Sequence, residues 1–486
     1  MSRIKKNNSF FFLTLLIVIS FIFISLDIDI QAEEISLEEA LNWGIENNSS
    51  IREIKDSIET IERSLNLIDT EYGFKSKISA NPIIVGGSDK LIDDSSNGDD
   101  EEDSSSESSS SSSSVISMKA TKLFSNGIFL QSEISLKEED LVDLEKLSEG
   151  PNSTFSVSKS FYPVLPIESE QEKYLASNNL LKARENLTWQ QKIKKIDFLE
   201  SYLNFLRLQE KLSLAKNNFQ YAQDDLNKIL KKIEIGEAGE KQEIEAKIVL
   251  KEAEINFLQA QNTFLQQKNN WYLNLSLPEE TEVPLVEDSP FLEEIIKWVG
   301  SLELNLKEEE LIELAVDNYY KIKNNLLDQD SAQKEAEWNL TKNKPQVDLF
   351  GAYSSKDNTW GIGVELNYDI FDGGKQKIED EGYQVKLENS RDDYLQIVSE
   401  LKLELSDLIN QYEINNLNLE EKLMSCEKAK LEEESYQLQL QQGLISDSEF
   451  QYKILDWQES KIDLKSAKEG ILINKLRIAH FLGIRK

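Results

Sequence analysis

Trp360-Gly-Ile-Gly-Val-Glu-Leu-Asn-Tyr-Asp-Ile370 is an unbroken alternation of apolar and polar residues. Successive side chains of a β-strand point to opposite faces, so this segment predicts a strand with one apolar and one polar face. Its length matches a tilted strand that crosses a lipid bilayer, which needs about 9–11 residues. From the alternation alone, a half-buried strand of a soluble sheet is an equally good interpretation.

Other alternating segments predict partners for this strand. Val347, Leu349 and Tyr353 complete a predicted hairpin over 346–370. The first half of the chain has an equivalent hairpin, which begins at Ile78, Ala80 and Ile84 and ends at Phe155, Val157 and Phe161. An extra hairpin is predicted from Ile116–Lys122 and Ile128–Leu136 around the turn Ser125-Asn126-Gly127, which adds strands to the set.

Two long stretches without proline predict long helices. No proline occurs between Pro166 and Pro278 or after Pro345, and apolar residues recur there every three or four positions. A helix of ~60 residues would be on the order of 90 Å long. The first stretch has two apolar rows and should therefore pack on two sides; the rows are Ile196, Leu199, Leu203 and Leu206, and Phe198, Tyr202 and Phe205.

Glycine interrupts each helical stretch once. Gly236 and Gly239 interrupt the first and Gly443 interrupts the second, and helical periodicity resumes after each interruption. Because glycine is favoured just beyond a helix end, we expect helical-hairpin tips near 236–239 and near 443–446.

The two halves of the chain share a pattern. Residues 37–48, LEEALNWGIENN, resemble residues 307–318, KEEELIELAVDN. We therefore predict two structural repeats, 33–277 and 307–486, joined by a linker at 278–306 that forms an equatorial belt. An acidic polyserine insertion at 88–114 interrupts the first repeat, and its low hydrophobicity predicts disorder.

The amino-terminal segment has the features of a secretory signal. Arg3, Lys5 and Lys6 precede an apolar run, and a small residue, Ala32, follows it, which predicts a signal peptide over 1–32. The remaining sequence has no apolar run long enough for a transmembrane helix. Any part that crosses a membrane must then be a closed β-barrel.

Composition excludes several kinds of chemistry. The formal net charge is −35, from 89 acidic and 54 basic residues, which argues against nucleic acid as a partner. His480 and Cys426 are the only histidine and cysteine, so a His-based catalytic triad, a His/Cys zinc site and a disulfide cannot be assembled. We expect no enzyme activity, no metal and no cofactor.

Several segments together resemble the TolC-like outer-membrane efflux proteins. The most specific is 360–374, WGIGVELNYDIFDGG, in which a strand runs into Phe-Asp-Gly-Gly before a helix. The others are 35–41 with 46–48, 311–318, 442–446 and 482–483. The resemblance extends over 35–483, apart from the serine-rich insertion.

This resemblance implies both an architecture and a role. Three copies would complete one transmembrane β-barrel, continued by an α-helical coiled-coil barrel in the periplasm. The homotrimer would be the outer-membrane channel of a tripartite efflux or secretion system, a passive exit duct that works with a periplasmic adaptor protein and an inner-membrane transporter. Outer-membrane lipid would surround the barrel.

The resemblance also points to a gate and to docking tips. Acidic residues beyond the second tip form the narrowest ring in that family; Glu449 matches the first of them, Tyr452 stands at the place of the second, and Asp447 is the alternative acid. Asp447 and Glu449 have an equally weighted interpretation as first-turn acids that favour a helix start. The expected adaptor-docking tips comprise Gly236, Gly239, Gly443 and Leu444, although Glu237 replaces the apolar residue usual after Gly236.

A second class of function accounts for the long helices without a channel. A periplasmic or surface coiled-coil protein with a structural or adhesive role would have the same helical periodicity. Such a protein would be a water-soluble rod with no requirement for detergent.

Overall fold

The computed structural model describes residues 34–80, 114–137, 151–278, 281–284, 289–302 and 308–484. The predicted signal peptide and residues 88–113 of the predicted polyserine insertion lie outside these residues. The chain divides into two compact units. Unit 1 comprises Met1–Arg52, Gln190–Leu311 and Glu404–Lys486, and unit 2 comprises Glu53–Trp189 and Ile312–Leu403.

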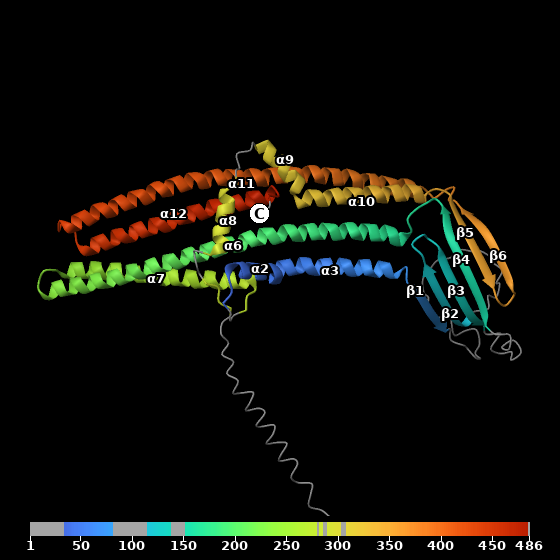
Figure 1. Ribbon diagram of the computed structural model, residues 1–486, viewed down its shortest axis with the longest axis horizontal. Coiled ribbons are helices and arrows are strands. Elements are labelled where there is room, and N and C mark those ends of the chain that lie inside the picture. Colours follow the sequence, from blue (N-terminus) through green and yellow to red (C-terminus); the bar gives the residue numbers. More distant parts are fainter. Residues whose placement is uncertain are drawn as a thin grey trace, which may run out of the picture. The chain divides into compact units, whose positions relative to one another are not determined.

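Unit 1 consists of helices. Two helical hairpins make up most of it: the carboxyl-terminal part of α6 (Glu168–Glu234) with α7 (Glu240–Leu275), and the corresponding part of α11 (Lys375–Gln441) with α12 (Asp447–Phe481) (Figure 1). Two short helices, α2 (Leu37–Asn47) and α8 (Pro290–Gly300), complete the unit. Helix α8 lies within the predicted linker 278–306.

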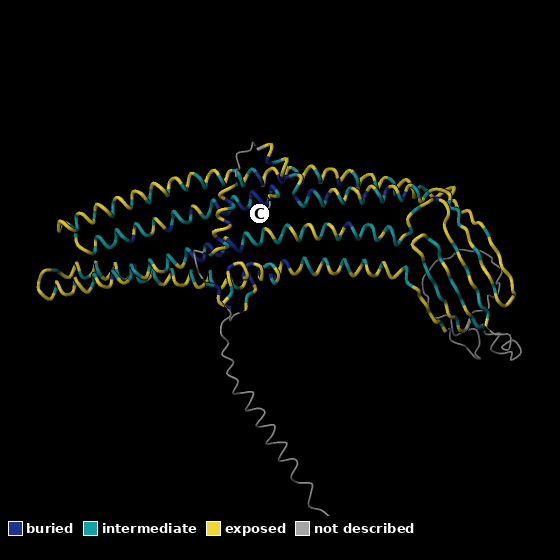
Figure 2. Tube along the Cα trace, viewed as in Figure 1, coloured by how far each residue is buried: buried dark blue, intermediate teal, exposed yellow. Residues whose placement is uncertain are grey.

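The core of unit 1 is built around α6, which packs on two sides as its two apolar rows predict. On one side, the ring centroids of Tyr202 and Trp271 lie 5.6 Å apart, and Trp271 Nε1 donates a hydrogen bond to the Phe198 carbonyl at 3.1 Å. On the other side, Leu203 lines an apolar cavity with Leu292 of α8 and Leu472 of α12. Figure 2 shows the buried residues gathered around α2, α8 and the adjoining parts of α6, α7 and α12.

Unit 2 joins helices to one antiparallel sheet. Its helices are most of α3 (Ser49–Thr70), most of α9 (Glu308–Asn318), α10 (Tyr320–Lys342) and the amino-terminal parts of α6 and α11. Its strands are β1 (Phe74–Ala80), β2 (Ser114–Leu123), β3 (Phe129–Lys137), β4 (Asn152–Tyr162), β5 (Gln346–Ser354) and β6 (Thr359–Asn367). The strands pair in sequence order, from β1 to β6.

Polar contacts join the helices of unit 2. Arg184 of α6 forms an ion pair with Glu62 of α3 at 2.7 Å. On the other side of α6, Asn178 donates a hydrogen bond to Ser331 of α10 at 3.0 Å. The Asn325 side chain of α10 in turn donates to the Ser390 carbonyl of α11 at 3.1 Å. The helices that carry the sheet are thus held in register by hydrogen bonds and charges as well as by apolar packing.

The extra hairpin predicted from the sequence is present as β2 and β3. It lies between β1 and β4, so it is an integral part of the sheet. The turn between its strands contains Gly127 at φ +79°, a left-handed conformation that favours glycine. Ser114, the last residue of the predicted insertion, is the first residue of β2.

The last predicted strand is shorter than its alternation indicates. β6 ends at Asn367, so Tyr368 and Ile370 lie beyond it. Asn367 pairs with Gln346, which is the first residue of β5. Residues past Asn367 therefore have no neighbouring strand with which to form a ladder, although their side-chain pattern continues to alternate.

Candidate functional site

Each helical hairpin of unit 1 ends in a tip with the same backbone arrangement. Gly236 and Gly443 follow the ends of α6 and α11 with φ of +79° and +69°. At the second tip, the Leu444 N–H donates to the Gln439 carbonyl at 2.9 Å, and at the first, the Glu237 N–H donates to the Lys232 carbonyl at 2.8 Å. These are helix-terminating bonds that need a left-handed residue, which glycine supplies.

The N-cap residue of the next helix stands three residues after that glycine at each tip, and the helix itself begins one residue later. Gly239 precedes α7, and its N–H donates to the Gln242 side chain at 2.9 Å; Ser446 precedes α12, and its N–H donates to Glu449 Oε2 at 2.8 Å. Gly239 has an ordinary extended φ of −117°, so its position at the tip does not require the backbone conformations that only glycine adopts easily. Leu444 is exposed at the second tip.

Glu449, the first residue of the predicted gate, forms part of the N-terminal cap of α12. Its side chain accepts from the Ser446 N–H, and the Glu449 N–H donates to Ser446 Oγ at 3.2 Å. These two hydrogen bonds form a capping box, in which each residue satisfies the backbone N–H of the other. The backbone hydrogen bond from Ser446 lowers the pKa of Glu449, and the Ser446 side chain lowers it further.

The other two predicted gate residues lie near α6. Asp447 Oδ2 is 3.5 Å from Lys228 Nζ. The hydroxyl of Tyr452 is buried and has no hydrogen-bond partner among the described residues. Its burial, together with the nearby Asp225 carboxylate, raises the pKa of Tyr452. Ser448, between them in sequence, donates a hydrogen bond to Asp225.

The residues of α6 that meet the predicted gate are not marked by any pattern in the sequence. Asp225 and Lys228 are one turn apart on α6, where they resemble any exposed helical charges. Only the antiparallel packing of α6 and α12, which brings residues more than 200 positions apart together, gives them a place near Asp447. No short-range pattern could have identified them.

The contact at the tip is the last step of a longer series between α6 and α12. Further ion pairs join Glu210 to Lys465, Arg207 to Glu469 and Glu200 to Arg477 at 2.5, 3.1 and 2.6 Å. We call this series, from Lys228–Asp447 to Glu200–Arg477, the α6–α12 ladder. It connects the first helical hairpin to the second along the length of α12.

The sheet of unit 2 has one apolar and one polar face. Residues directly opposite in an antiparallel pair share a face, so the strand register assigns each side chain. The apolar face carries Phe74, Ile78, Met118, Leu130, Ile134, Phe155, Val157, Leu349, Tyr353, Trp360, Ile362, Val364 and Leu366, with Lys122 and Lys159 among them. The polar face carries Lys75, Lys77, Lys119, Thr121, Gln131, Glu133, Ser156, Ser158, Asp348, Glu365 and Asn367, and one row across it contains the apolar residues Leu123, Phe129 and Phe350.

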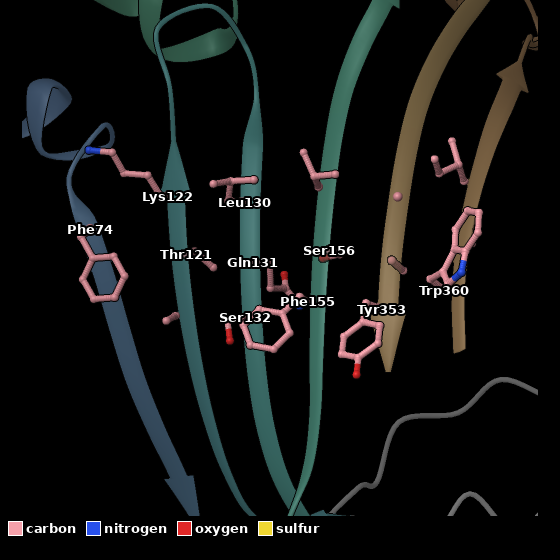
Figure 3. A pocket seen from close by; sticks show the side chains of 16 residues that line it. Phe74, Thr121, Lys122, Leu130, Gln131, Ser132, Phe155, Ser156, Tyr353 and Trp360 are labelled. Atoms are coloured by element: carbon pink, nitrogen blue, oxygen red, sulfur yellow. The ribbon is translucent and has the colours of Figure 1, made fainter. Parts of the chain in front are cut away.

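The apolar face is open to solvent in the single chain. Figure 3 shows Phe74, Phe155, Tyr353 and Trp360 along a hollow that extends from β1 to β6. Phe155 and Tyr353 are cross-strand neighbours with ring centroids 6.5 Å apart. Trp360 is 76% exposed and Ile362 is 79% exposed, so this large apolar surface has no cover within the described chain. Such a surface marks a contact with a partner or with lipid.

Other candidate chemistry is weaker. Among the described residues, no group of three or more His, Cys, Asp and Glu side chains is placed to hold a metal ion. Within the same ranges, no helix is both long and apolar enough to cross a lipid bilayer. His480 is buried in α12, and burial, with a contribution from Lys192, lowers its pKa to about 4. Its imidazole is therefore neutral at pH 7.

Comparison with known proteins gives fold-level matches. No protein-family model and no curated protein matches the sequence. Among solved structures, the CusC channel matches over 92% of this chain and 91% of its own, with 11% identity and a TM-score of 0.61. The outer membrane protein VceC of Vibrio cholerae matches over 92% and 96%, with 12% identity and a TM-score of 0.58. The CmeC outer membrane channel of Campylobacter jejuni matches over 92% and 85%, with 12% identity and a TM-score of 0.59. The chain therefore has the fold of the TolC-like outer-membrane channels that its sequence resembles.

Proposed function

We propose that this protein is the outer-membrane channel component of a tripartite efflux or secretion system and acts as a passive exit duct. The observation that supports the proposal most strongly is a sheet with one apolar and one polar face, in a chain whose fold is similar to that of outer-membrane channels. An apolar face that is uncovered in the single chain fits lipid, and a polar face fits a water-filled lumen. Six strands are too few for one chain to enclose such a lumen, so we infer a homotrimer that completes the barrel.

The proposal assigns a place to each part of the chain. The signal peptide 1–32 directs export, and the sheet lies in the outer membrane. The repeats 33–277 and 307–486 supply two helical hairpins per copy, which form the periplasmic coiled-coil barrel, and the linker 278–306 forms a belt around it. Two tips with equivalent glycine turns and caps support this division into repeats.

The tips are the proposed contacts with a periplasmic adaptor protein. Ile235 and Leu444 are 69% and 68% exposed beside the two tip glycines, Gly236 and Gly443. Exposed apolar side chains on a rigid turn are suited to a complementary apolar groove. An inner-membrane transporter would deliver the cargo to the same end of the duct.

The proposed gate is the α12 start, held closed by α6. Opening moves the second hairpin away from the first. This requires the Lys228–Asp447 ion pair and the Ser448–Asp225 hydrogen bond to separate and the Tyr452 hydroxyl to leave its buried site. These contacts are few and partly exposed, so the free energy that holds the gate is small enough for an adaptor to overcome.

The experiment that tests this function begins with membrane fractionation of the exported chain. The detergent-extracted protein should be a trimer and should conduct ions in a planar bilayer. Asp447→Asn should raise the conductance of the closed channel. A water-soluble monomer without pore activity would instead support the periplasmic or surface coiled-coil protein, the second candidate that the long helices favour.

A further inference from the structure

The sheet leaves two edges open, and their directions are compatible. Six antiparallel strands in sequence order place β1 at one edge and β6 at the other. Because the number of strands is even, β1 and β6 run in opposite directions. The β6 edge of one copy can therefore pair with the β1 edge of the next copy in the same antiparallel manner as every pair within the chain.

Like charges stand side by side at each edge. At the β1 edge, Lys77 lies directly opposite Lys119 on the polar face. At the β6 edge, Glu365 lies directly opposite Asp348 on the same face. Like charges in directly opposite positions destabilise a sheet. The two edges thus carry unfavourable pairs of opposite sign, which a neighbouring copy would relieve.

The register of the sheet determines which residues meet. Following the pairs across the sheet, Lys75 of β1 is in line with Gly361 of β6. Glu365 lies four residues beyond Gly361, so within one copy it is in line with Glu71, four residues before Lys75. Closing a barrel requires a total register shift, the shear, which is set by the tilt of the strands. For eighteen strands tilted by about 36°, the shear is about eighteen residues, so each of three copies contributes a shift of about six residues.

That shift brings Glu365 opposite Lys77 of the next copy. The same shift aligns the helix-side ends of the two strands. Without it, the part of β6 that extends beyond Gly361 toward the helices would lack a partner, because β1 begins only at Phe74. The resulting row on the polar face is Asp348, Glu365, then Lys77, Lys119 and Glu133 of the next copy. Each like-charged pair gains an opposite charge at the junction.

We propose that β6 of one copy pairs with β1 of another through Glu365 and Lys77, and that three such junctions close an eighteen-stranded barrel. This inference rests on the proposed function, since it specifies how the trimer closes. The β2–β3 hairpin is the feature that widens the barrel, because each copy contributes six strands instead of four. The diameter is on the order of 35 Å between strand axes, wide enough for a water-filled lumen.

Disulfide cross-linking in the full-length, membrane-embedded protein tests the junction. In a Cys426→Ser background, Lys77→Cys is combined with Glu365→Cys and the membranes are oxidised. Opposite positions in an antiparallel pair are close enough for a disulfide, so we expect a covalent trimer. Ile78→Cys with Glu365→Cys, on opposite faces, is the matched control and should give about tenfold less product.

The outcomes separate this inference from the proposed function. A conducting trimer that gives no more cross-link with Lys77→Cys than with the Ile78→Cys control would overturn the junction and leave the channel in place. Absence of both trimer and conductance would overturn both. A projection image of the trimer down its axis gives a second measurement: eighteen strands support the inference, and a twelve-stranded barrel with β2–β3 outside it contradicts the inference.

Charge reversal gives a third measurement that does not depend on cysteine chemistry. Glu365→Lys should cause loss of the trimer at temperatures that the parent trimer survives. The introduced lysine would lie beside Lys77 and Lys119 of the next copy, so three positive charges would meet at each junction. Adding Lys77→Glu should restore it. Failure of the double variant to recover would count against a direct contact between the two residues.

Discussion

Arg207 of α6 and Glu469 of α12 form the least exposed ion pair of the α6–α12 ladder, with Nη1 and Oε2 3.1 Å apart. The two side chains are 23% and 11% exposed, and Arg207 also donates to Ser466 at 2.9 Å. A further pair between the same two helices, Lys211 of α6 and Asp463 of α12, also belongs to this ladder; its charged atoms are 3.5 Å apart and its side chains are 42% and 39% exposed. Within the ladder, a half-buried ion pair therefore lies next to a solvent-exposed one.

Replacing Arg207 should destabilise unit 1 much more than replacing Lys211. Arg207→Met leaves the Glu469 carboxylate partly buried without its cation, and we expect a loss of about 2 kcal/mol of unfolding free energy. Lys211→Met should cost less than about 0.5 kcal/mol, because exposed pairs contribute little. Urea unfolding in detergent compares the two variants. Equal losses would mean that burial does not distinguish the two steps.

Glu449→Gln separates the two roles weighed for Glu449. Gln242 already closes the corresponding cap at the first tip, so a glutamine at 449 should preserve the cap and remove only the charge. If Glu449 lines the gate, cation selectivity in planar bilayers should fall in Glu449→Gln and Glu449→Ala alike. If its only role is to cap α12, Glu449→Gln should conduct like the parent protein and only Glu449→Ala should lower the melting temperature.

The tip glycines should respond differently to substitution. Gly443→Ala places a side chain at φ +69° and should cost about 1 kcal/mol, although a Cβ there would meet no atom within 4 Å. Gly239→Ser should be neutral or slightly stabilising, because Gly239 occupies a helix N-cap with an extended φ and serine is favoured there. Thermal unfolding of both variants tests the assignment, and a destabilising Gly239→Ser would contradict it.

His480 should make unit 1 less stable in acid. Its pKa is about 4 in the folded chain against an ordinary value of 6.5, so the unfolded chain binds the proton first as the pH falls. Stability is full above about pH 6.5 and should decrease by about 3 kcal/mol as the pH falls to about 4. The His480→Phe variant should lack this component of the pH dependence. Urea midpoints at pH 7.5 and pH 4.5 measure the difference; the same slope in both proteins would exclude His480 as its source.

Phe350 and Gly363 form a close pair on the polar face of the sheet. A Cβ at Gly363 would lie 2.3 Å from Phe350 Cζ, so the ring covers the glycine. Gly363→Val should therefore destabilise the β5–β6 hairpin by about 1–3 kcal/mol through overpacking. The double variant with Phe350→Ala should recover part of that loss. The heat resistance of the assembled protein in detergent is the measurement, and no recovery would mean that the ring is not the obstacle.

Local patterns in the sequence predicted much of this fold. Period-two alternation located β5 and β6, and a Ser-Asn-Gly turn located the β2–β3 hairpin. Gly236 and Gly443 marked the tips because only a left-handed residue ends those helices as observed. These features depend on residues that are close together in the chain, which is why the sequence revealed them.

Features that depend on distant partners could not be predicted in this way. β6 ends at Asn367 because β5 begins at Gln346, and the alternation through Ile370 carries no information about that limit. Asp225 and Lys228 lie beside the predicted gate residues only because α6 packs against α12. Glu449 was predicted to be either a gate acid or a first-turn acid favoured by the helix dipole. Its capping hydrogen bonds with Ser446 were not predicted, because they depend on the conformation of Ser446.

The two-faced sheet has a consequence for how the protein matures. Neither water nor lipid alone satisfies a lone sheet, since one face is apolar, the other is charged, and both edges have unpaired backbone groups. The helices also expose apolar side chains in the single chain, among them Ile248, Leu417 and Leu431, but each helix satisfies its backbone hydrogen bonds internally. On the proposed assembly, insertion of the sheet and closure of the barrel therefore form a single event. If three copies close the barrel at the membrane as proposed, the strands must be kept from aggregating until the copies meet.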